Sequence, residues 1–151
     1  MLYETKKNRI MSLLLPTFAM AEQNLKPQVF ESKFDFQQTL STLEETFLQK
    51  GMKIFTKIDH QAAAKAVGLT MQPATVLIYG TPQVGTALMI KDPLLALQLP
   101  LKVLVTEANA RHVEVILNNA EQIVAHTNTP YKEVENSLAK AEKLIQTTIA
   151  K

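Results

Sequence analysis

The sequence predicts an α+β fold in which several β-strands lie between two long helices. Two segments, near residues 36–50 and 130–150, carry apolar residues every three or four positions, as a helix with one buried face does. The segments between them alternate in polarity or are wholly apolar, which is typical of strands. The order strand, helix, several strands, helix favours an antiparallel or mixed sheet covered on one face.

The first strand and the first helix follow each other directly. Residues 28–34 (QVFESKF) alternate between apolar and polar, which predicts a strand. Asp35 can cap the helix that follows, and Gln38 stands three residues later, as in a capping box. Gly51 is suited to the left-handed backbone that ends a helix. The expected buried face consists of Phe36, Leu40, Leu43 and Phe47.

Two further strands and a short helix are expected next. Residues 52–58 (MKIFTKI) form an alternating strand, with Met52, Ile54 and Thr56 on one face. Residues 61–67 form a short alanine-rich helix that ends at Gly68. Residues 73–79 (PATVLIY) are almost wholly apolar and β-branched, which indicates a strand buried on both faces.

The last third of the chain contains a hairpin and a long helix. We expect residues 85–97 to form a loop with short helical pieces, because Pro93 interrupts them. Residues 101–106 and 112–117 form two strands joined at Asn109-Ala110. The final helix begins with Thr129 as its cap and Pro130 at its first position. Its expected buried stripe is Tyr131, Val134, Leu138, Ala141, Ile145 and Ile149.

The N-terminus has the three parts of a secretory signal. Lys6, Lys7 and Arg9 precede the apolar run 10–18, and Ala19-Met20-Ala21 matches a cleavage site. A membrane-spanning helix is the alternative, but it needs roughly 20 apolar residues, and this run is shorter and contains a proline. We therefore expect a signal peptide over residues 1–21, a single domain over 22–151 without a stable membrane span, and a periplasmic or secreted location.

Charge and cysteine content exclude several classes of function. Four residues of the N-terminal segment, three basic and one acidic, account for the net charge of +2, because their removal from 16 basic and 14 acidic residues leaves 13 of each. A nucleic-acid-binding protein needs a cationic cluster, which the rest of the chain lacks. With no cysteine, disulfides, thiol catalysis, Cys-ligated zinc and iron–sulfur clusters are excluded.

A set of ordered motifs in the middle of the chain resembles a known family. They are DHQAAA at residues 59–64, GL at 68–69, Pro73, the strand ending LIYGTP at 77–82, GT at 85–86, and LPLK at 99–102. These motifs resemble the domain of unknown function 302 family, which usually has Asn where this chain has Thr81. The resemblance implies a β-α-β(4)-α unit of the TATA-binding-protein-like class, frequently a homodimer, and no established reaction.

Two polar constellations are candidates for a binding site. His60 could act as a base or a ligand group tuned by Asp59, or Asp59 could simply cap a helix with His60 beside it. Residues 80–86 (GTPQVGT) could cradle an anion with backbone N–H groups, or form a tight turn. The combined candidate patch is Asp59, His60, Gly80, Thr81, Pro82, Gly85, Thr86 and Lys102.

Other site chemistries find little support in the sequence. The three histidines are scattered and show no metal-binding spacing, so we expect no metal and no cofactor. No serine stands in a G-x-S-x-G motif. A group of apolar residues could line a pocket or a dimer interface, or belong to the core. This group is Met71, Met89, Leu94, Leu95, Leu97 and Leu99.

Three functions are compatible with this pattern. The first is a dimeric cell-envelope module that binds a small apolar or anionic molecule or a protein partner through the candidate patch. The second is an enzyme, a hydrolase or isomerase, with His60 as its base and Lys102 or loop amides as its electrophilic side. The third is a structural or stress-related envelope protein without a ligand site.

Overall fold

The structure is a computed structural model that describes residues 26–109 and 111–150. The expected signal peptide, residues 1–21, lies outside the described residues. A five-stranded sheet forms the centre, in the order β1-β5-β4-β3-β2, and every neighbouring pair is antiparallel. The strands are β1 (Gln28–Glu31), β2 (Lys53–Asp59), β3 (Ala74–Gly80), β4 (Leu101–Asn109) and β5 (His112–Leu117).

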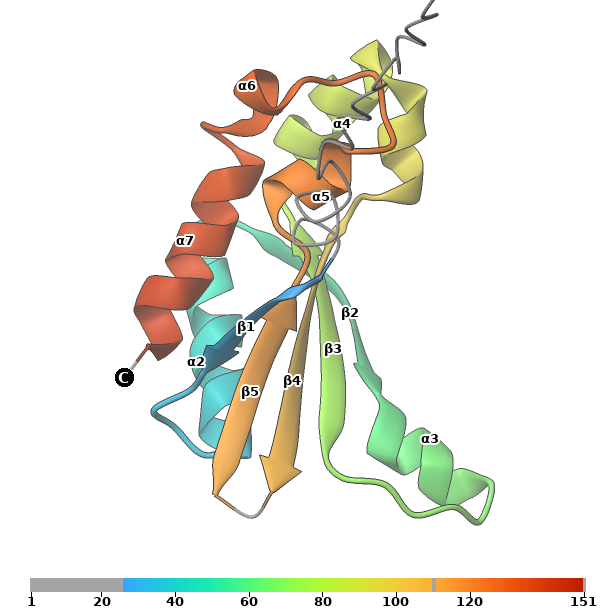
Figure 1. Cartoon of the computed structure of the whole chain (residues 1–151), viewed down its shortest axis with the longest axis vertical. Coiled ribbons are helices and arrows are strands. Elements are labelled where there is room, and N and C mark those ends of the chain that lie inside the picture. Colours follow the sequence, from blue (N-terminus) through green and yellow to red (C-terminus); the bar gives the residue numbers. More distant parts are fainter. Residues whose placement is uncertain (1–25, 110, 151) are drawn as a thin grey trace, which may run out of the picture.

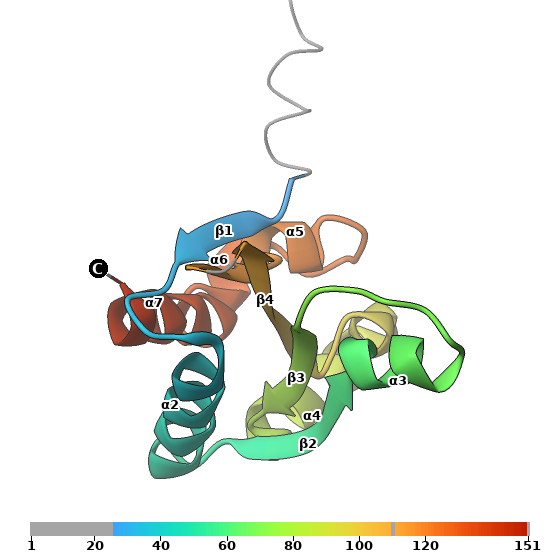
Figure 2. The same cartoon turned by 90° about the horizontal axis from the view of Figure 1, so that it is seen from below.

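Apart from α3 (His60–Ala66), the helices lie on one face and around one end of this sheet (Figure 1). These other helices are α2 (Phe36–Gln49), α4 (Pro82–Lys91), the 3₁₀ helix η1 (Pro93–Leu97), α5 (Ala120–Val124), α6 (Tyr131–Val134) and α7 (Leu138–Ile149). The two longest, α2 and α7, cover the same face of the sheet, while α3 projects from the far end of β2 and β3 (Figures 1 and 2). The predicted α+β class and the helix-covered antiparallel sheet are confirmed.

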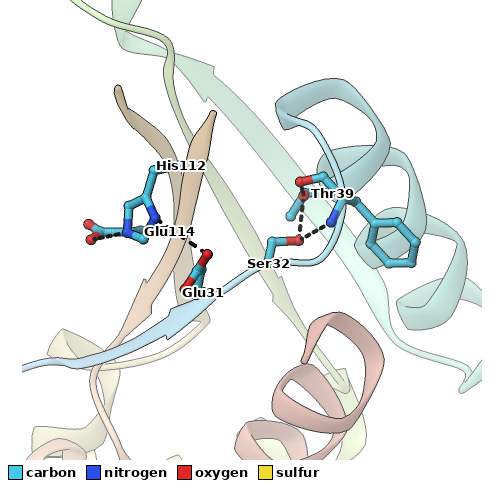
Figure 3. Close-up of polar contacts among 6 residues, drawn as sticks. Glu31, Ser32, Thr39, His112 and Glu114 are labelled. Atoms are coloured by element: carbon cyan, nitrogen blue, oxygen red, sulfur yellow. Dashed lines mark hydrogen bonds and ion pairs between the residues drawn. The ribbon is translucent and has the colours of Figure 1, made fainter. Parts of the chain in front are cut away.

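Helix α2 begins and ends where its local sequence predicts. The Asp35 carboxylate accepts a 2.7 Å hydrogen bond from the Gln38 N–H, and Gly51 has the positive φ of 74° that favours glycine. The first strand, however, ends at Glu31 rather than at residue 34. Ser32 instead accepts a hydrogen bond from the Phe34 N–H and bonds the Thr39 hydroxyl at 2.7 Å, which turns the chain into α2 (Figure 3).

The main core lies between the sheet and the helices α2 and α7. Its centre is a parallel stack of the Phe47 and Tyr79 rings, whose centroids are 4.1 Å apart. Both side chains are almost completely buried. From the C-terminal side, Ile145 and Ile149 of α7 fill the same core. Most residues of the apolar stripes predicted for the first long helix and for the C-terminal helix therefore pack together over one face of the sheet.

A second, smaller core lies at the end of the sheet beside α4. Leu88 and Leu95 come from α4 and η1, and Ile123, Val134 and Leu138 come from the C-terminal helices. Helix α5, which the sequence pattern did not predict, begins with a complete capping box between Asn119 and Gln122. The cap stabilises a helix too short for a visible apolar period.

The predicted C-terminal helix is divided into two, which corrects the sequence interpretation. Helix α6 ends at Val134 and α7 begins at Leu138, with Ser137 donating from its hydroxyl to the Val134 carbonyl oxygen at 3.3 Å. Asn and Ser side chains compete with the helix backbone in this way. Thr129 is not the cap, because its hydroxyl bonds Asp92, and Tyr131 is 41% exposed rather than buried.

Two strands also differ from expectation. In β2 the pairing with β3 shifts between Ile54 and Thr56, so a β-bulge places Ile54 opposite Tyr79 and Thr56 opposite Ile78. Thr56 consequently lies on the other face of the sheet from Ile54. Strand β3 was expected to be buried on both faces, but the long helices α2 and α7 cover only the face that carries Leu77 and Tyr79.

Candidate functional site

A cavity of about 240 Å³ lies where β2, β3 and β4 end against α4 and α7. It is located at the junction of the two cores, because Ala141 of the main core and Leu99 and Leu138 of the second core all line it. Five of the eight candidate residues also line it, namely Gly80, Thr81, Pro82, Gly85 and Thr86. The structure thus places the segment 80–86 in the wall of a cavity.

The lining of this cavity is mostly apolar. The remaining lining residues are Met52, Phe55, Val84, Met89, Leu99, Pro100, Leu101, Ser137, Leu138 and Ala141. Polar side chains are limited to the hydroxyls of Thr81, Thr86 and Ser137, and no ionisable side chain takes part. Such a surface holds an uncharged, apolar molecule by burial and dispersion contacts, with a hydroxyl available to orient it.

The structure of the segment 80–86 differs from both structures predicted for it, the anion-binding loop and the tight turn. Strand β3 ends at Gly80, Thr81 is the N-cap residue of α4, and Pro82 occupies the first helical turn. The Gly85 N–H donates to the Thr81 carbonyl oxygen at 3.0 Å, as in an ordinary helix. The segment is therefore a strand-to-helix junction, neither a tight turn nor a loop of free amides around an anion. Residues 85–97, expected to form a loop with short helical pieces, are helical except at Asp92, as α4 and η1.

Apolar residues from distant parts of the sequence complete the cavity. Met89 and Leu99 belong to the apolar group that the sequence marked as a pocket, an interface or core, and both line the cavity. Leu95 is buried in the second core, whereas Leu97 is 79% exposed. Ala141, from α7, carries no local signal of a site, because an alanine on a buried helical stripe has the pattern of ordinary core.

Asp59 and His60 lie at the opposite end of the sheet from this cavity. Lys53 pairs with Gly80, whereas Asp59, six residues further along β2, pairs with Thr75. Six strand residues span about 20 Å. The Asp59 carboxylate accepts a 2.9 Å hydrogen bond from the Ala62 N–H and caps α3. The structure therefore divides the eight-residue patch, and the antiparallel pairing of β2 and β3 is the reason.

Lys102 is also separated from the cavity, although Leu101 beside it is a lining residue. Successive strand residues point to opposite faces of a sheet. Lys102 pairs with Ile78 on the face that the long helices of this chain leave uncovered, and it is exposed there. It cannot serve as an electrophilic partner for a molecule held on the other face.

The described part of the chain shows neither a metal site nor a membrane span. Within residues 26–109 and 111–150, no group of three or more His, Cys, Asp or Glu side chains could hold a metal ion. Over the same residues, no helix has the length and apolar character needed to cross a bilayer.

Fold and site together define a small α+β domain with a half-covered antiparallel sheet and an apolar cavity at its end. Residues 28–151 match the family described as Domain of unknown function DUF302, and the chain belongs to that family. The crystal structure of an uncharacterized conserved protein DUF302 from Bacillus stearothermophilus is similar, with a TM-score of 0.73 and 18% identity. That similarity covers 82% of this chain and 98% of the other, and it shows the shared fold.

Curated relatives come from three Brucella strains. The proteins named Fluoride-specific ion channel FluC 1 from Brucella suis biovar 1 (strain 1330) and from Brucella abortus biovar 1 (strain 9-941) are each 34% identical to this chain over 89 residues. The matched region covers 59% of this chain but only 35% and 33% of those proteins. The similarity to this chain thus extends over about a third of each relative.

Proposed function

We propose that this protein is an exported, dimeric module that binds a small apolar molecule in the cavity between α4, α7 and the sheet. The single observation that supports this most directly is the cavity itself, which is bounded by apolar side chains from several elements. A well-formed apolar concavity with a few polar groups is the usual form of a small-molecule site. The N-terminal signal pattern supports export, and the family resemblance supports a dimer.

The volume limits the size of the molecule. Ligand pockets commonly measure roughly 300–1,000 Å³, and a cavity of about 150 Å³ accommodates benzene. At about 240 Å³ this cavity is intermediate, which suits a molecule of one or two rings or a short aliphatic chain. An anion is disfavoured, because an ion moved from water into an apolar site without a partner loses much of its solvation energy.

Two methionines allow a direct test. The protein is labelled with ¹³C at the methionine methyl groups and titrated with indole as a two-ring apolar probe. Met52 and Met89 line the cavity, whereas Met71 does not and serves as the internal reference. We expect the signals of Met52 and Met89 to shift and that of Met71 to stay in place.

Gly85→Leu is the variant that should abolish this response. A Cβ atom at Gly85 would lie 3.9 Å from Leu99 Cδ1 and 4.0 Å from Met89 Cε, so a longer side chain would occupy the cavity. Ala87→Leu adds a comparable volume at an exposed position of the same helix and is the matched control. Indole shifts that persist in a folded Gly85→Leu protein, or no shift in the parent, would contradict the proposal.

The enzymatic alternative has less support. His60 is exposed, about 20 Å along β2 from the cavity, and Lys102 lies on the opposite face of the sheet. These groups cannot act together on one molecule in the cavity. His60→Ala should therefore leave indole binding at Met89 unchanged.

A second candidate function follows from the Brucella relatives. Because a region similar to this chain makes up part of proteins named as fluoride channels, the domain can work beside a membrane transport protein. The apolar cavity is unsuited to fluoride itself, so its contribution would come through a neighbouring protein. Deletion of the gene should then lower the sodium fluoride concentration that inhibits growth, and unchanged growth would remove this candidate.

A further inference from the structure

One face of the sheet is not covered by the long helices α2 and α7, and only the short helix α3 contacts β3 on that side (Figure 2). A row of five apolar residues crosses this face, one from each strand, and each is the direct pairing partner of the next. The row, called here the apolar row, consists of Ile58, Val76, Leu104, Ile116 and Val29. Directly opposed residues in antiparallel strands share a face, so the row runs unbroken across the whole sheet.

The apolar row has the composition of an interior but is only partly covered. Val29 at one end is 55% exposed and Ile58 at the other end is 39% exposed, while the three residues between them are half-buried by their neighbours. A contiguous exposed apolar surface marks an interaction site. The almost wholly apolar sequence of β3 is typical of a strand buried on both faces, and the long helices supply only one of the two covers.

Charges flank the apolar row with opposite signs at its two sides. Lys102 lies on β4 on the side toward the cavity, beside Ile78. On the other side Glu31 and Glu114 pair directly across β1 and β5. The His112 ring stands between these carboxylates, 3.5 Å from Glu31 Oε1 and 3.1 Å from Glu114 Oε1, on the side of the sheet away from α2 (Figure 3).

This charge pattern is complementary to itself. When two copies pack these faces together about a two-fold axis that runs across the strands, the apolar rows coincide and each basic side meets an acidic side. With the axis along the strands, the basic side would meet the basic side: an axis along β4 places Lys102 opposite Lys102, and Glu114 opposite the position of Ala74 on β3. Packed sheets lie about 10 Å apart with interdigitating side chains, and like charges facing each other there oppose association.

We propose that the face carrying the apolar row is the interface of a two-fold symmetric homodimer, in which Lys102 approaches Glu114 of the partner subunit. In this arrangement Lys102 lies over the position of Thr106 in the second copy, and Glu114 is the strand neighbour of Thr106. Within one chain Lys102 and Thr106 are four residues apart along β4, about 13 Å, so the pairing is formed between subunits. This deepens the dimeric part of the proposed function by naming its surface.

Helix α3 enlarges the surface available to a second copy. Five strands spaced about 4.8 Å apart give a face about 24 Å wide, and a stable interface buries roughly 800 Å² on each partner. Helix α3 stands on the same side of the sheet, away from α2 and α7 (Figure 2). It has no buried residue, and Val67 and Leu69 after it are 72% and 66% exposed. We expect this projecting segment to contact the partner.

The test measures the association state of the full chain by analytical ultracentrifugation. Leu104→Glu places a charge at the centre of the apolar row, twice in each dimer, and should weaken association at least about 100-fold. Lys102→Glu and Glu114→Lys should each weaken it about tenfold, because like charges then meet. The double variant Lys102→Glu/Glu114→Lys should restore association to within about threefold of the parent. Lys140→Glu, on the exposed side of α7, is the control and should change nothing.

Three outcomes would overturn the proposal. The first is a parent chain that stays monomeric at about 100 µM, a concentration far above the dissociation constants of standard interfaces. The second is a folded Leu104→Glu variant that remains dimeric. The third is a double variant Lys102→Glu/Glu114→Lys that associates no more strongly than either single variant. The first of these outcomes includes a monomeric parent that instead binds lipid vesicles or a different protein. Because the apolar row and the cavity lie on opposite faces, a monomeric Leu104→Glu variant should still bind indole. The dimer hypothesis and the ligand hypothesis are therefore tested separately, and one can be wrong while the other holds.

Discussion

The Thr129 hydroxyl donates a 2.8 Å hydrogen bond to the buried carboxylate of Asp92, 37 residues earlier in the chain. The same carboxylate accepts hydrogen bonds from the N–H groups of Asn128 at 2.7 Å and Leu94 at 3.2 Å. Asp92 stands between α4 and η1, and Thr129 stands before α6. This carboxylate therefore joins the helices beside the cavity to the C-terminal helices that close it.

We predict that Asp92 makes the protein sensitive to acid. Burial alone would raise the pKa of its carboxyl, but the hydrogen bonds from Thr129, Asn128 and Leu94 outweigh it and hold the pKa below the usual value of 3.8. Its stabilising contribution is present above the unfolded-state pKa and is lost as the pH falls below about 4. Urea denaturation of the parent and of Asp92→Asn should show a smaller loss of stability on acidification in the variant. Equal losses would contradict this role.

We predict that the ionisation of Tyr79 lowers the stability of the protein at alkaline pH. Burial, together with the charge of Glu142, raises the pKa of the Tyr79 phenol well above its usual value of 10. The stability that comes from keeping this phenol neutral is present below pH 10 and is lost at higher pH. The tyrosinate absorbance of Tyr79 should develop only as the protein unfolds, which a comparison with Tyr79→Phe isolates. A phenol that ionises at its usual pKa in the folded protein would show that it is not buried.

The stack of Phe47 on Tyr79 should be a large contributor to stability. Phe47→Ala removes a fully buried ring from the centre of the main core and should lower the free energy of unfolding by about 3–5 kcal/mol. Phe47→Leu, which fills part of the space, is the control and should cost less. Chemical denaturation measures both, and a cost below about 1 kcal/mol for Phe47→Ala would mean that the surroundings collapse into the space.

Two glycines should respond in opposite directions to the same substitution. Gly51→Ala forces a side chain into a backbone with φ of 74° and should cost about 1 kcal/mol or more. Gly85→Ala lies inside α4, where the added methyl group meets only ordinary contacts, and should stabilise by up to about 1 kcal/mol. Thermal denaturation of both variants tests the pair. A destabilised Gly85→Ala protein would show that its site has no room for a methyl group.

The cap at Asp59 should matter for stability and not for the cavity. Asp59→Ala removes the hydrogen bond to the Ala62 N–H and should cost about 1 kcal/mol. The shift of the Met89 methyl signal with indole should be unchanged, because α3 and the cavity lie at opposite ends of β2. If the Asp59→Ala protein is folded but its Met89 signal no longer shifts with indole, the prediction that Asp59 is independent of the cavity is wrong.

Local patterns predicted much of the fold. The caps at Asp35 and Asp59, the left-handed glycines and the strand over residues 112–117 each depend on neighbours within a few positions, and the structure confirms them. The failures also have local causes. Ser137 interrupts an otherwise continuous helical period, the bulge after Ile54 changes the face of Thr56, and α5 is too short to show a period.

The candidate site was predictable only in part. The segment from Gly80 to Thr86 lines the cavity, but the other lining residues have the sequence pattern of ordinary core, and Ala141 shows why, because nothing local separates it from its buried stripe. Grouping Asp59 and His60 with Gly80 failed for a different reason. Both ends of a strand are equally marked by polar residues in the sequence, and only the pairing register shows that they are far apart.

The sequence by itself determined the α+β class, the first long helix, the approximate positions of the five strands and the unusual double-sided apolar character of β3. Those features follow from periodicity, capping and backbone preference, which act over a few residues. The tertiary structure alone decided that a cavity forms between the two cores and that Ile58, Val76, Leu104, Ile116 and Val29 align in one row. Both depend on the register and packing of segments distant in the chain, and no local pattern encodes those distances.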